Sequence, residues 1–347
     1  MRAWIYTQCG LPPDCLKLSN DTPLPKLPTD TSTLVKVSHV ALHPGTIILM
    51  RTIPMLFRRP PIIAETDFSG TIVAVGNKVP TASADGYRNF PIGTDVFGSI
   101  NVSNHIKGNG ALAEYLAIET TSIAQKPPTL TFAEASGLAV SASTALALLD
   151  AAKLKEGQNI LIYAPCGGIG SYFTQLARNA VGPSAKIVGV CTREKWETAK
   201  ELGCDELLDY RPSPEQTSII STLTDQFDVN KGLGFDCIID CYGSQELWYS
   251  CAKYLKPGNE HAYVSVGVKF DSYSFYGMMM AVLKMLGNIS MPAWLGGVDR
   301  AYRQVAAFVN TESLERLRSL CAEGKLKTVV GGEWKLDESM KASRIRF

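Results

Sequence analysis

The stretch that decides the fold is QNILIYAPCGGIGSYFTQLA, residues 158–177. A short, β-rich apolar run reaches a glycine turn, and behind the turn apolar residues recur at helical spacing. This order predicts a strand, a tight turn and a helix. Gly167 would let the backbone approach a pyrophosphate, Gly170 would let the helix pack closely on the strand, and the helix N-terminus would supply amide donors. The stretch therefore predicts a dinucleotide-binding turn.

This turn departs from the usual dinucleotide fingerprint, because Pro165 stands at its first glycine position. A glycine turn alone is weak evidence, and some other α/β protein is the alternative. About twenty residues on, however, residues 186–190 (KIVGV) form a second apolar run that completes a βαβ unit. The predicted cofactor-binding residues of the turn are Pro165, Gly167, Gly168, Ile169 and Gly170.

Composition narrows the possible partners. The 347 residues are 46% hydrophobic, and 34 Lys and Arg nearly balance 33 Asp and Glu. Such a chain is typical of a soluble globular protein without the broad field that binds nucleic acids or anionic membranes. It begins without an apolar signal-peptide core and its nine cysteines form no paired framework, so we expect a reducing, cytoplasmic location. The longest apolar region, residues 277–294, is too short and too interrupted for a membrane span.

The secondary-structure pattern changes near the Pro127-Pro128 pair. Residues 1–127 read as strands and turns, which favours a β domain. Residues 128–295 alternate helices with short apolar strands, which is typical of a doubly wound parallel sheet. The strands predicted there are 158–164, 186–190, 206–208, 236–240 and 262–266. We expect residues 296–347 to return to the first domain through a helix within 302–323 and a closing segment at 329–334.

Six stretches, taken in order, carry a family resemblance. They are Thr66-Asp67-Phe68-Ser69-Gly70 with Val75-Gly76, Gly110–Tyr115, the glycine turn, Leu202–Asp205 with Asp209-Tyr210, Ile239-Asp240 with Gly243, and Leu255–Gly258. Together they resemble the medium-chain dehydrogenase/reductase superfamily, in its zinc-free branch of quinone oxidoreductases and enoyl reductases, which includes fungal proteins often labelled zinc-binding oxidoreductases. The likeness covers nearly the whole chain. It implies an α/β protein with a GroES-like β domain, a Rossmann domain with a doubly wound parallel sheet, and an active-site cleft between them.

Zinc ligands are the first feature to test against this resemblance. Alcohol dehydrogenases of the superfamily hold a catalytic zinc with Cys, His and acidic ligands and a structural zinc with four clustered cysteines. Here no cysteine lies between Cys15 and Cys166, and Thr66 stands where zinc members have a ligand histidine. Cys237 and Cys241, on a strand and its exit turn, are more typical of core cysteines than of a ligand pair. We therefore predict no metal.

The catalytic region departs from the pattern of the branch. Relatives carry Asn-Pro-x-Asp where this chain has His43-Pro44-Gly45-Thr46, and the tyrosine of some enoyl reductases has no counterpart in residues 50–57. His43 is able to donate a proton near neutral pH, and a purely structural, hydrogen-bonded histidine is the alternative. The candidate catalytic residues are His43 and, second, Thr46.

The end of the second strand predicts the choice of cofactor. NAD-specific Rossmann proteins place an acidic residue there for the ribose hydroxyls, whereas this chain has Cys191, followed by Thr192-Arg193-Glu194-Lys195. Arg and Lys beside a hydroxyl suit the 2′-phosphate of NADPH, and a solvated charge pair at a helix start is the alternative. The resemblance also implies a tyrosine beside the adenosine and two glycines beside the nicotinamide. The cofactor-binding residues predicted beyond the turn are Thr144, Thr192, Arg193, Lys195, Tyr210, Gly243 and Gly267.

These features predict an NADPH-dependent, metal-independent reductase. Hydride would pass to an electron-poor C=C of a small, apolar α,β-unsaturated carbonyl or to a quinone, while the protein orients the nicotinamide, excludes water and hydrogen-bonds the developing enolate oxygen. The alternative is a divergent family member used for binding, or for isomerisation or cyclisation of a small apolar metabolite. The departures at Pro165, His43 and Thr46 keep that alternative open.

Relatives end in a closing Gly-Lys-Val-Val strand, whereas this sequence stops at residues 343–347. The missing strand would leave a sheet edge uncovered in the first domain, and truncation, alternative splicing and a stabilising partner are all open explanations.

Self-association is predicted from residues 287–297. Family members commonly pair a late edge strand with its symmetry mate, so we expect a homodimer in which Ile289, Met291 and Trp294 supply the apolar contacts. Pro292, which removes an amide donor, would instead mark an edge that is kept from pairing.

Overall fold

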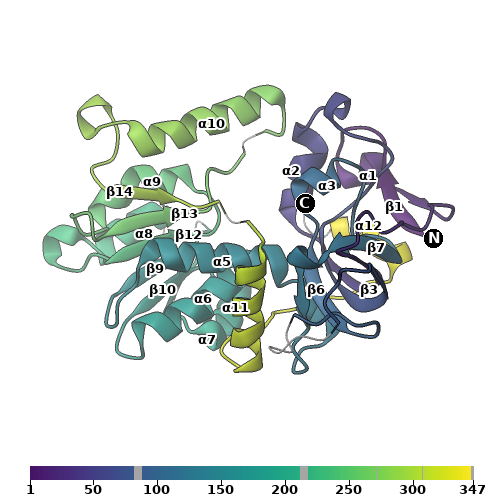
Figure 1. Cartoon of the computed structure of the whole chain (residues 1–347). Helices are drawn as coiled ribbons and strands as arrows, with labels where there is room; N and C mark the ends of the chain where they lie inside the picture. Colours follow the sequence, from purple (N-terminus) through teal and green to yellow (C-terminus); the bar gives the residue numbers. More distant parts are fainter. Residues whose placement is uncertain (82–87, 212–217, 271, 307, 345–347) are drawn as a thin grey trace. The chain divides into compact units, whose positions relative to one another are not determined.

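The computed structural model describes residues 1–81, 88–211, 218–270, 272–306 and 308–344. The chain forms two compact units, and Figure 1 shows their elements. The first unit comprises Met1–Ser143 and Phe308–Phe347, and the second comprises Thr144–Ala307. Each unit has its own β-sheet and its own hydrophobic core.

The first unit is built on two antiparallel sheets, with strand orders β7-β3-β5-β6-β8 and β2-β1-β4. The strands are β1 (Ala3–Tyr6), β2 (Lys17–Ser19), β3 (Ser32–Ala41), β4 (Ile62–Ile63), β5 (Asp67–Val75), β6 (Asp95–Ser99), β7 (Tyr115–Glu119) and β8 (Ile123–Gln125). The helices are α1 (Pro12–Cys15), α2 (Pro44–Thr52), α3 (Val102–His105), α4 (Phe132–Ser136), α11 (Thr311–Ala322) and α12 (Ser339–Arg344), and α5 (Ala139–Ala152) runs on into the second unit.

Strands β3 and β5 are antiparallel neighbours that approach each other closely at the centre of the larger sheet. At Gly70 of β5 a Cβ would lie 2.3 Å from the carbonyl oxygen of Lys36 on β3, so only glycine fits there. The pairing continues to the last residue of β3, where Ala41 lies opposite Asp67, the first residue of β5. The chain that follows β3 and the chain that precedes β5 are thereby held side by side.

The second unit is a six-stranded parallel sheet with the order β11-β10-β9-β12-β13-β14 (Figure 1). Its strands are β9 (Ile160–Tyr163), β10 (Ile187–Val190), β11 (Glu206–Leu208), β12 (Cys237–Asp240), β13 (Ala262–Ser265) and β14 (Ala301–Gln304). Its helices are α6 (Gly168–Val181), α7 (Trp196–Leu202), α8 (Ile219–Gln226), α9 (Gln245–Ser250) and α10 (Phe275–Ser290). The chain builds outward from β9 on one side and then from β12 on the other, so the topological switch point lies between these strands.

The inner strands of this sheet are short apolar runs without polar alternation. Residues of β10, β12 and β13 are buried throughout, as expected for parallel strands covered on both faces. All five strands predicted from the sequence are present, as β9 to β13. The prediction of a β domain followed by a doubly wound parallel sheet is confirmed.

The predicted late edge strand at residues 287–297 is wrong. Helix α10 continues through Gly287 to Ser290, and a single 3-10 turn, η6 (Ala293–Leu295), follows Pro292. The helix ends where it does because the Met291 amide still donates to the Gly287 carbonyl, whereas the proline after it has no amide to donate. The edge of the sheet is instead β14, which pairs with β13.

Strand β14 also corrects the expected helix at 302–323. Its four residues pair in parallel with β13, and the helix α11 begins only at Thr311, after the capping residue Asn310. The boundaries between the two units differ from the predicted ones, 127/128 and 295/296, for two physical reasons. Helix α4 packs on β3 and β5, which keeps residues 128–143 with the first unit, and β14 extends the second unit to residue 307. Residues 329–334 contain no helix or strand.

In the described part of the chain, no helix has both the length and the apolar character needed to cross a membrane. Residues 345–347, on which the prediction about the chain end falls, lie outside the described residues.

Candidate functional site

The glycine turn lies at the carboxyl end of β9, beside the topological switch point. Helix α6 begins directly after Gly167, and a Cβ on Gly170 would lie 2.0 Å from the carbonyl oxygen of Ala164. Glycine at position 170 therefore allows the helix to pack on the turn. A Cβ on Gly167 would meet only Ala164 O at 3.5 Å, and Gly167 and Gly168 are exposed. The N-terminus of α6 is thus open to an anionic group, while Ile169 is half-buried behind it.

Pro165 fits the turn because the neighbouring strand makes room for it. It is buried, and its Cγ lies 3.1 Å from the position that a Cβ would take on Gly189 of β10. The Thr174 hydroxyl of α6 donates to the Pro165 carbonyl at 3.4 Å. The departure from the usual fingerprint is therefore accommodated by a glycine on the adjacent strand.

A buried carboxylate organises the loop at the ends of β12 and β13. Asp240 accepts the backbone amides of residues 242–244 at 2.7–2.9 Å and the Tyr263 hydroxyl at 2.6 Å. Burial raises the pKa of Asp240, and these hydrogen bonds oppose that effect. Gly243 has φ +93°, and a Cβ there would lie 2.4 Å from the Gly267 carbonyl. The two glycines predicted to border the nicotinamide therefore lie side by side.

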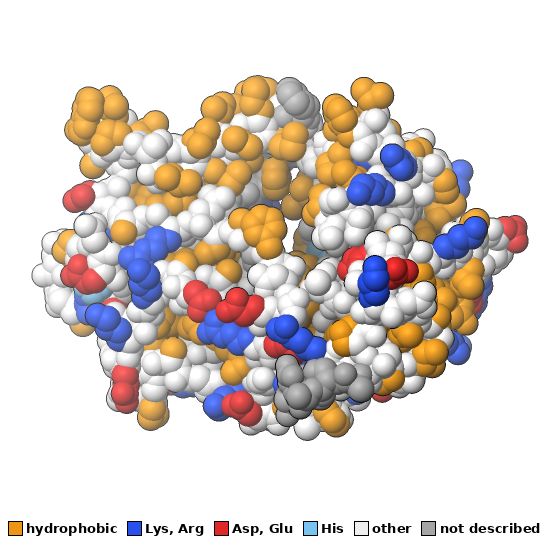
Figure 2. All heavy atoms as spheres, viewed as in Figure 1, with side chains coloured by type: hydrophobic (Ala, Val, Ile, Leu, Met, Phe, Trp, Pro, Cys, Tyr) orange, Lys and Arg blue, Asp and Glu red, His pale blue; other side chains and the backbone are white. Residues whose placement is uncertain are grey.

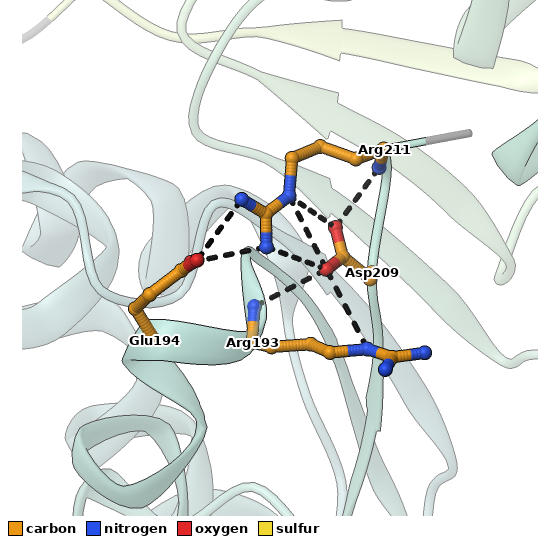
Figure 3. Close-up of polar contacts among 4 residues, drawn as sticks. All are labelled: Arg193, Glu194, Asp209 and Arg211. Atoms are coloured by element: carbon orange, nitrogen blue, oxygen red, sulfur yellow. Dashed lines mark hydrogen bonds and ion pairs between the residues drawn. The ribbon is translucent and has the colours of Figure 1, made fainter. Parts of the chain in front are cut away.

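Four charged side chains meet at the ends of β10 and β11 (Figure 3). Arg211 makes two hydrogen bonds to Glu194, both 3.0 Å long, and reaches Asp209 at 2.9 Å. The Arg193 amide donates to Asp209 at 3.3 Å, and its Nε lies 3.9 Å from the same carboxylate. Hydrogen bonding by Arg211 holds the pKa of Asp209 below its ordinary value. Two cations and two anions thus balance in this cluster.

The other predicted cofactor residues differ in their placement. Thr192 precedes a 3-10 turn, η3 (Arg193–Lys195), and its carbonyl accepts the Lys195 amide at 2.9 Å. Tyr210, with 46% of its surface exposed, lies between Asp209 and Arg211 in the segment that follows β11. Thr144 is half-buried on α5, a different element.

His43 in the first unit takes part in a hydrogen-bonded chain. It is the N-cap residue of α2, two residues after the end of β3, and its side chain is 15% exposed. Its Nε2 lies 2.9 Å from Thr66 Oγ1, and that hydroxyl donates to Asp67 Oδ1 at 3.2 Å. Because Thr66 donates onward, its oxygen accepts from His43, which places the ring proton on Nε2. Asp67 is buried, and its other oxygen accepts the Val140 amide at 2.9 Å.

The opposite edge of the His43 ring lies beside Gly45. A Cβ on that glycine would lie 2.8 Å from Nδ1 of the imidazole. Since any other residue would press against the ring, Gly45 keeps space beside Nδ1.

Thr46, the second catalytic candidate, is fully buried. Its hydroxyl donates to Glu65 Oε2 at 2.9 Å, and the His43 amide approaches the same oxygen at 3.4 Å. Glu65 is itself buried and has φ +60°. Thr46 and Glu65 therefore brace the backbone around His43, and the Thr46 hydroxyl does not face solvent.

Metal ligands are not gathered in the described parts of either unit. Among those residues there is no group of three or more His, Cys, Asp or Glu placed to hold an ion. Cys237 donates to the Ala262 carbonyl at 3.2 Å, and burial raises the pKa of its thiol to about 12. A thiol of this kind stays protonated, whereas a metal ligand must be a thiolate.

Sequence reasoning missed Glu65, Asp67, Asp209 and Arg211 as site residues. Asp67 and Asp209 stand inside stretches that carry the family resemblance, which was the available signal. Glu65 meets Thr46 across 19 positions and Arg211 meets Glu194 across 17, so these contacts depend on strand pairing that no local pattern reveals.

The chain matches two family models. The alcohol dehydrogenase GroES-like domain matches residues 29–128, and the zinc-binding dehydrogenase model matches residues 168–311. The trans-enoyl reductase poxH of Penicillium oxalicum is 30% identical and aligns over 99% of this chain and 93% of its own length. The chain belongs to the medium-chain dehydrogenase/reductase superfamily. The predicted resemblance is confirmed.

Further relatives of this medium-chain reductase agree. The NADPH-dependent alkenal/one oxidoreductase of Arabidopsis thaliana is 31% identical over 66% of the chain and 56% of its own length. The structure of the quinone oxidoreductase from Coxiella burnetii matches with a TM-score of 0.72, at 24% identity, over 100% of this chain and 95% of that one, which shows the shared fold. The chain is thus a reductase of the enoyl and quinone reductase type, and its cofactor is a nicotinamide dinucleotide.

Proposed function

We propose that this chain is an NADPH-dependent, metal-independent reductase of the electron-poor C=C of α,β-unsaturated carbonyls, or of quinones. The observation that carries the proposal is the chain His43–Thr66–Asp67, which provides a proton donor next to the position of a ligand histidine in zinc members. The open glycine turn of the second unit fits a pyrophosphate. When bound, the dihydronicotinamide supplies the hydride.

The role proposed for His43 is to supply the proton that balances hydride addition. With Nε2–H held by Thr66, the second proton of the imidazolium is on Nδ1, the atom beside Gly45. The buried Asp67 carboxylate lies 3.9 Å from Nε2. Nδ1–H then hydrogen-bonds the developing enolate oxygen and transfers its proton, which leaves the neutral Nε2–H tautomer. Thr46 and Glu65 are positioning residues for this ring.

The relatives support the substrate class and the cofactor, since their names specify enoyl, alkenal or quinone substrates and, for one, NADPH. The nine cysteines are free thiols, which supports a cytoplasmic location because a reducing compartment preserves them.

Steady-state consumption of NADPH with a panel of enones, enals and quinones tests the proposed function. We expect turnover with at least one conjugated acceptor in buffer treated with a metal chelator. Absence of turnover across the panel, with NADPH bound, would instead favour a binding or isomerising protein.

We propose that the charged cluster at the ends of β10 and β11 selects NADPH. The Arg193 side chain is 71% exposed, and its terminal guanidinium nitrogens point beyond Asp209, so they are available to a 2′-phosphate (Figure 3). Arg211 contributes differently, because it covers the Asp209 carboxylate that would otherwise attract the ribose hydroxyls of NADH.

Two substitutions separate these roles. Arg193→Gln should weaken NADPH binding about tenfold and leave NADH binding unchanged, because one phosphate contact is lost. By contrast, Arg211→Gln should strengthen NADH binding, because the Asp209 carboxylate is then uncovered and attracts the ribose hydroxyls. Fluorescence titration with both cofactors measures this, with Lys231→Gln, a surface residue paired only locally with Asp228, as the control. Equal losses for both cofactors would contradict the assignment.

We also propose a homodimer, formed through α10 rather than through a strand. Figure 2 shows hydrophobic side chains along the upper edge of the view, over α10. The exposed apolar residues are Tyr276, Met279, Val282, Leu283, Leu286 and Ile289 on the helix, with Met291, Trp294 and Leu295 after it. Their spacing of three to four makes one stripe, and a second copy of the stripe is its simplest apolar cover.

Light scattering at micromolar concentration tests the dimer. We expect a mass near twice 37.7 kDa, reduced to one chain in Met291→Glu/Trp294→Glu. Leu233→Glu, which alters another exposed apolar residue of the same unit, should leave the dimer intact. A wild-type mass of one chain would rule the dimer out.

A further inference from the structure

An indole ring lies against the exposed arginine of the charged cluster. Arg193 is in η3, and Trp196 follows three residues later as the first residue of α7. The guanidinium carbon of Arg193 lies over the Trp196 ring, 5.8 Å from the ring centroid. A cation within about 6 Å of an indole centroid is attracted by the negative face of the ring. The two side chains therefore form a cation–π pair.

This pair adds to two contacts that already restrain Arg193. The Arg193 amide donates to Asp209 at 3.3 Å, and the Arg193 Nε lies 3.9 Å from the same carboxylate. An arginine side chain that is 71% exposed would otherwise sample many rotamers, and ordering it when a ligand binds lowers the affinity. Asp209 and Trp196 thus hold the guanidinium in place before a cofactor binds.

The Trp196 side chain is itself held by packing. It is half-buried, and its Nε1 is buried without a hydrogen-bond partner among the described residues. Because this N–H group is unpaired, its removal would not cost a hydrogen bond. The contact with Arg193 uses the face of the ring, which a phenyl group also provides. Phenylalanine is therefore the conservative replacement at this position.

We propose that Trp196 is a positioning residue for the selection of NADPH, because it holds Arg193 where the 2′-phosphate binds. The inference rests on the proposed function, in which Arg193 binds that phosphate. Trp196 acts through Arg193 and needs no contact of its own with the cofactor. NADH has no 2′-phosphate, so its affinity should not depend on the pair. Only ligands with a phosphate at the adenosine 2′ position gain from it.

Calorimetric titration with NADPH, NADH and adenosine 2′,5′-bisphosphate tests this selectivity. Trp196→Leu should weaken the binding of NADPH and of the bisphosphate about threefold and leave NADH binding unchanged. Trp196→Phe, which keeps an aromatic face, should bind all three ligands nearly as wild type does. The matched control is Trp334→Leu, the same replacement at a partly exposed tryptophan of the other unit, which should change none of the three affinities.

A double-mutant cycle tests whether Trp196 acts through Arg193. In the Arg193→Gln background, Trp196→Leu should cause no further loss of NADPH affinity, because the glutamine carries no charge for the ring to attract. Losses that add in the double variant would overturn the proposal, as would an equal loss for NADH in Trp196→Leu alone. Unchanged NADPH affinity in Trp196→Leu would overturn it too.

NMR relaxation of the Arg193 Nε–H group in the cofactor-free protein measures the contact itself. We expect a restrained side chain in wild type and in Trp196→Phe, and a more mobile one in Trp196→Leu. A mobile Arg193 side chain in the wild type would overturn the positioning role. If the wild type binds NADPH no more tightly than NADH, the proposed selection of NADPH fails, whereas the relaxation data still decide whether Trp196 orders Arg193.

Discussion

Replacing Gly170 with alanine should unfold the nucleotide-binding unit or destabilise it by about 3 kcal/mol or more. The new Cβ would lie 2.0 Å from the Ala164 carbonyl oxygen and 3.0–3.1 Å from two backbone carbons. All three are backbone atoms, which cannot move aside as the end of a flexible side chain can. Helix α6 would have to separate from the turn. Urea unfolding followed by circular dichroism measures the loss.

Gly167→Ala is the matched control, because its Cβ would meet only Ala164 O at 3.5 Å and its φ of −73° suits alanine. This variant should fold almost as stably as wild type. Its methyl group would nevertheless occupy the open space beside the helix N-terminus, so we expect about tenfold weaker NADPH binding. A stable Gly170→Ala, or a Gly167→Ala with wild-type affinity, would show that the turn does not act as proposed.

Replacing His43 with glutamine should lower kcat about a hundredfold while NADPH binding is retained, because only the proton donor is removed. Thr66→Val, which breaks the link to Asp67, should also lower kcat.

Thr66→Ser is the control for that link, since it keeps the hydroxyl and should preserve kcat. Steady-state kinetics, with NADPH affinity measured separately, make the comparison. Wild-type kcat in His43→Gln would show that the histidine is structural only.

The sheet of the second unit was predictable because its inner strands are continuous apolar runs. Such runs can be identified from the sequence without knowing which strands they pair with. Strand β14 was missed because Ala301-Tyr302-Arg303-Gln304 is half-buried and mixed in polarity. The late edge strand predicted at residues 287–297 was wrong because helix α10 continues to Ser290.

The candidate site was partly predictable for a similar reason. The glycine turn is a local pattern, and His43 is a recognisable departure from one. The Thr66 and Asp67 contacts depend instead on the β3–β5 pairing that ends at Ala41 and Asp67, which only the folded chain supplies.

The most direct test of the proposed reduction is to follow deuterium from C4-deuterated NADPH into an enone product. When the deuterium is on the face of C4 that gives up the hydride, we predict a saturated carbonyl product with one deuterium on the former β-carbon. Its new α-hydrogen should come from solvent. Mass spectrometry and NMR of the product locate the label. Two results would contradict the account. One is an alcohol product with deuterium on the former carbonyl carbon, and the other is a product without deuterium whichever face of NADPH C4 is labelled.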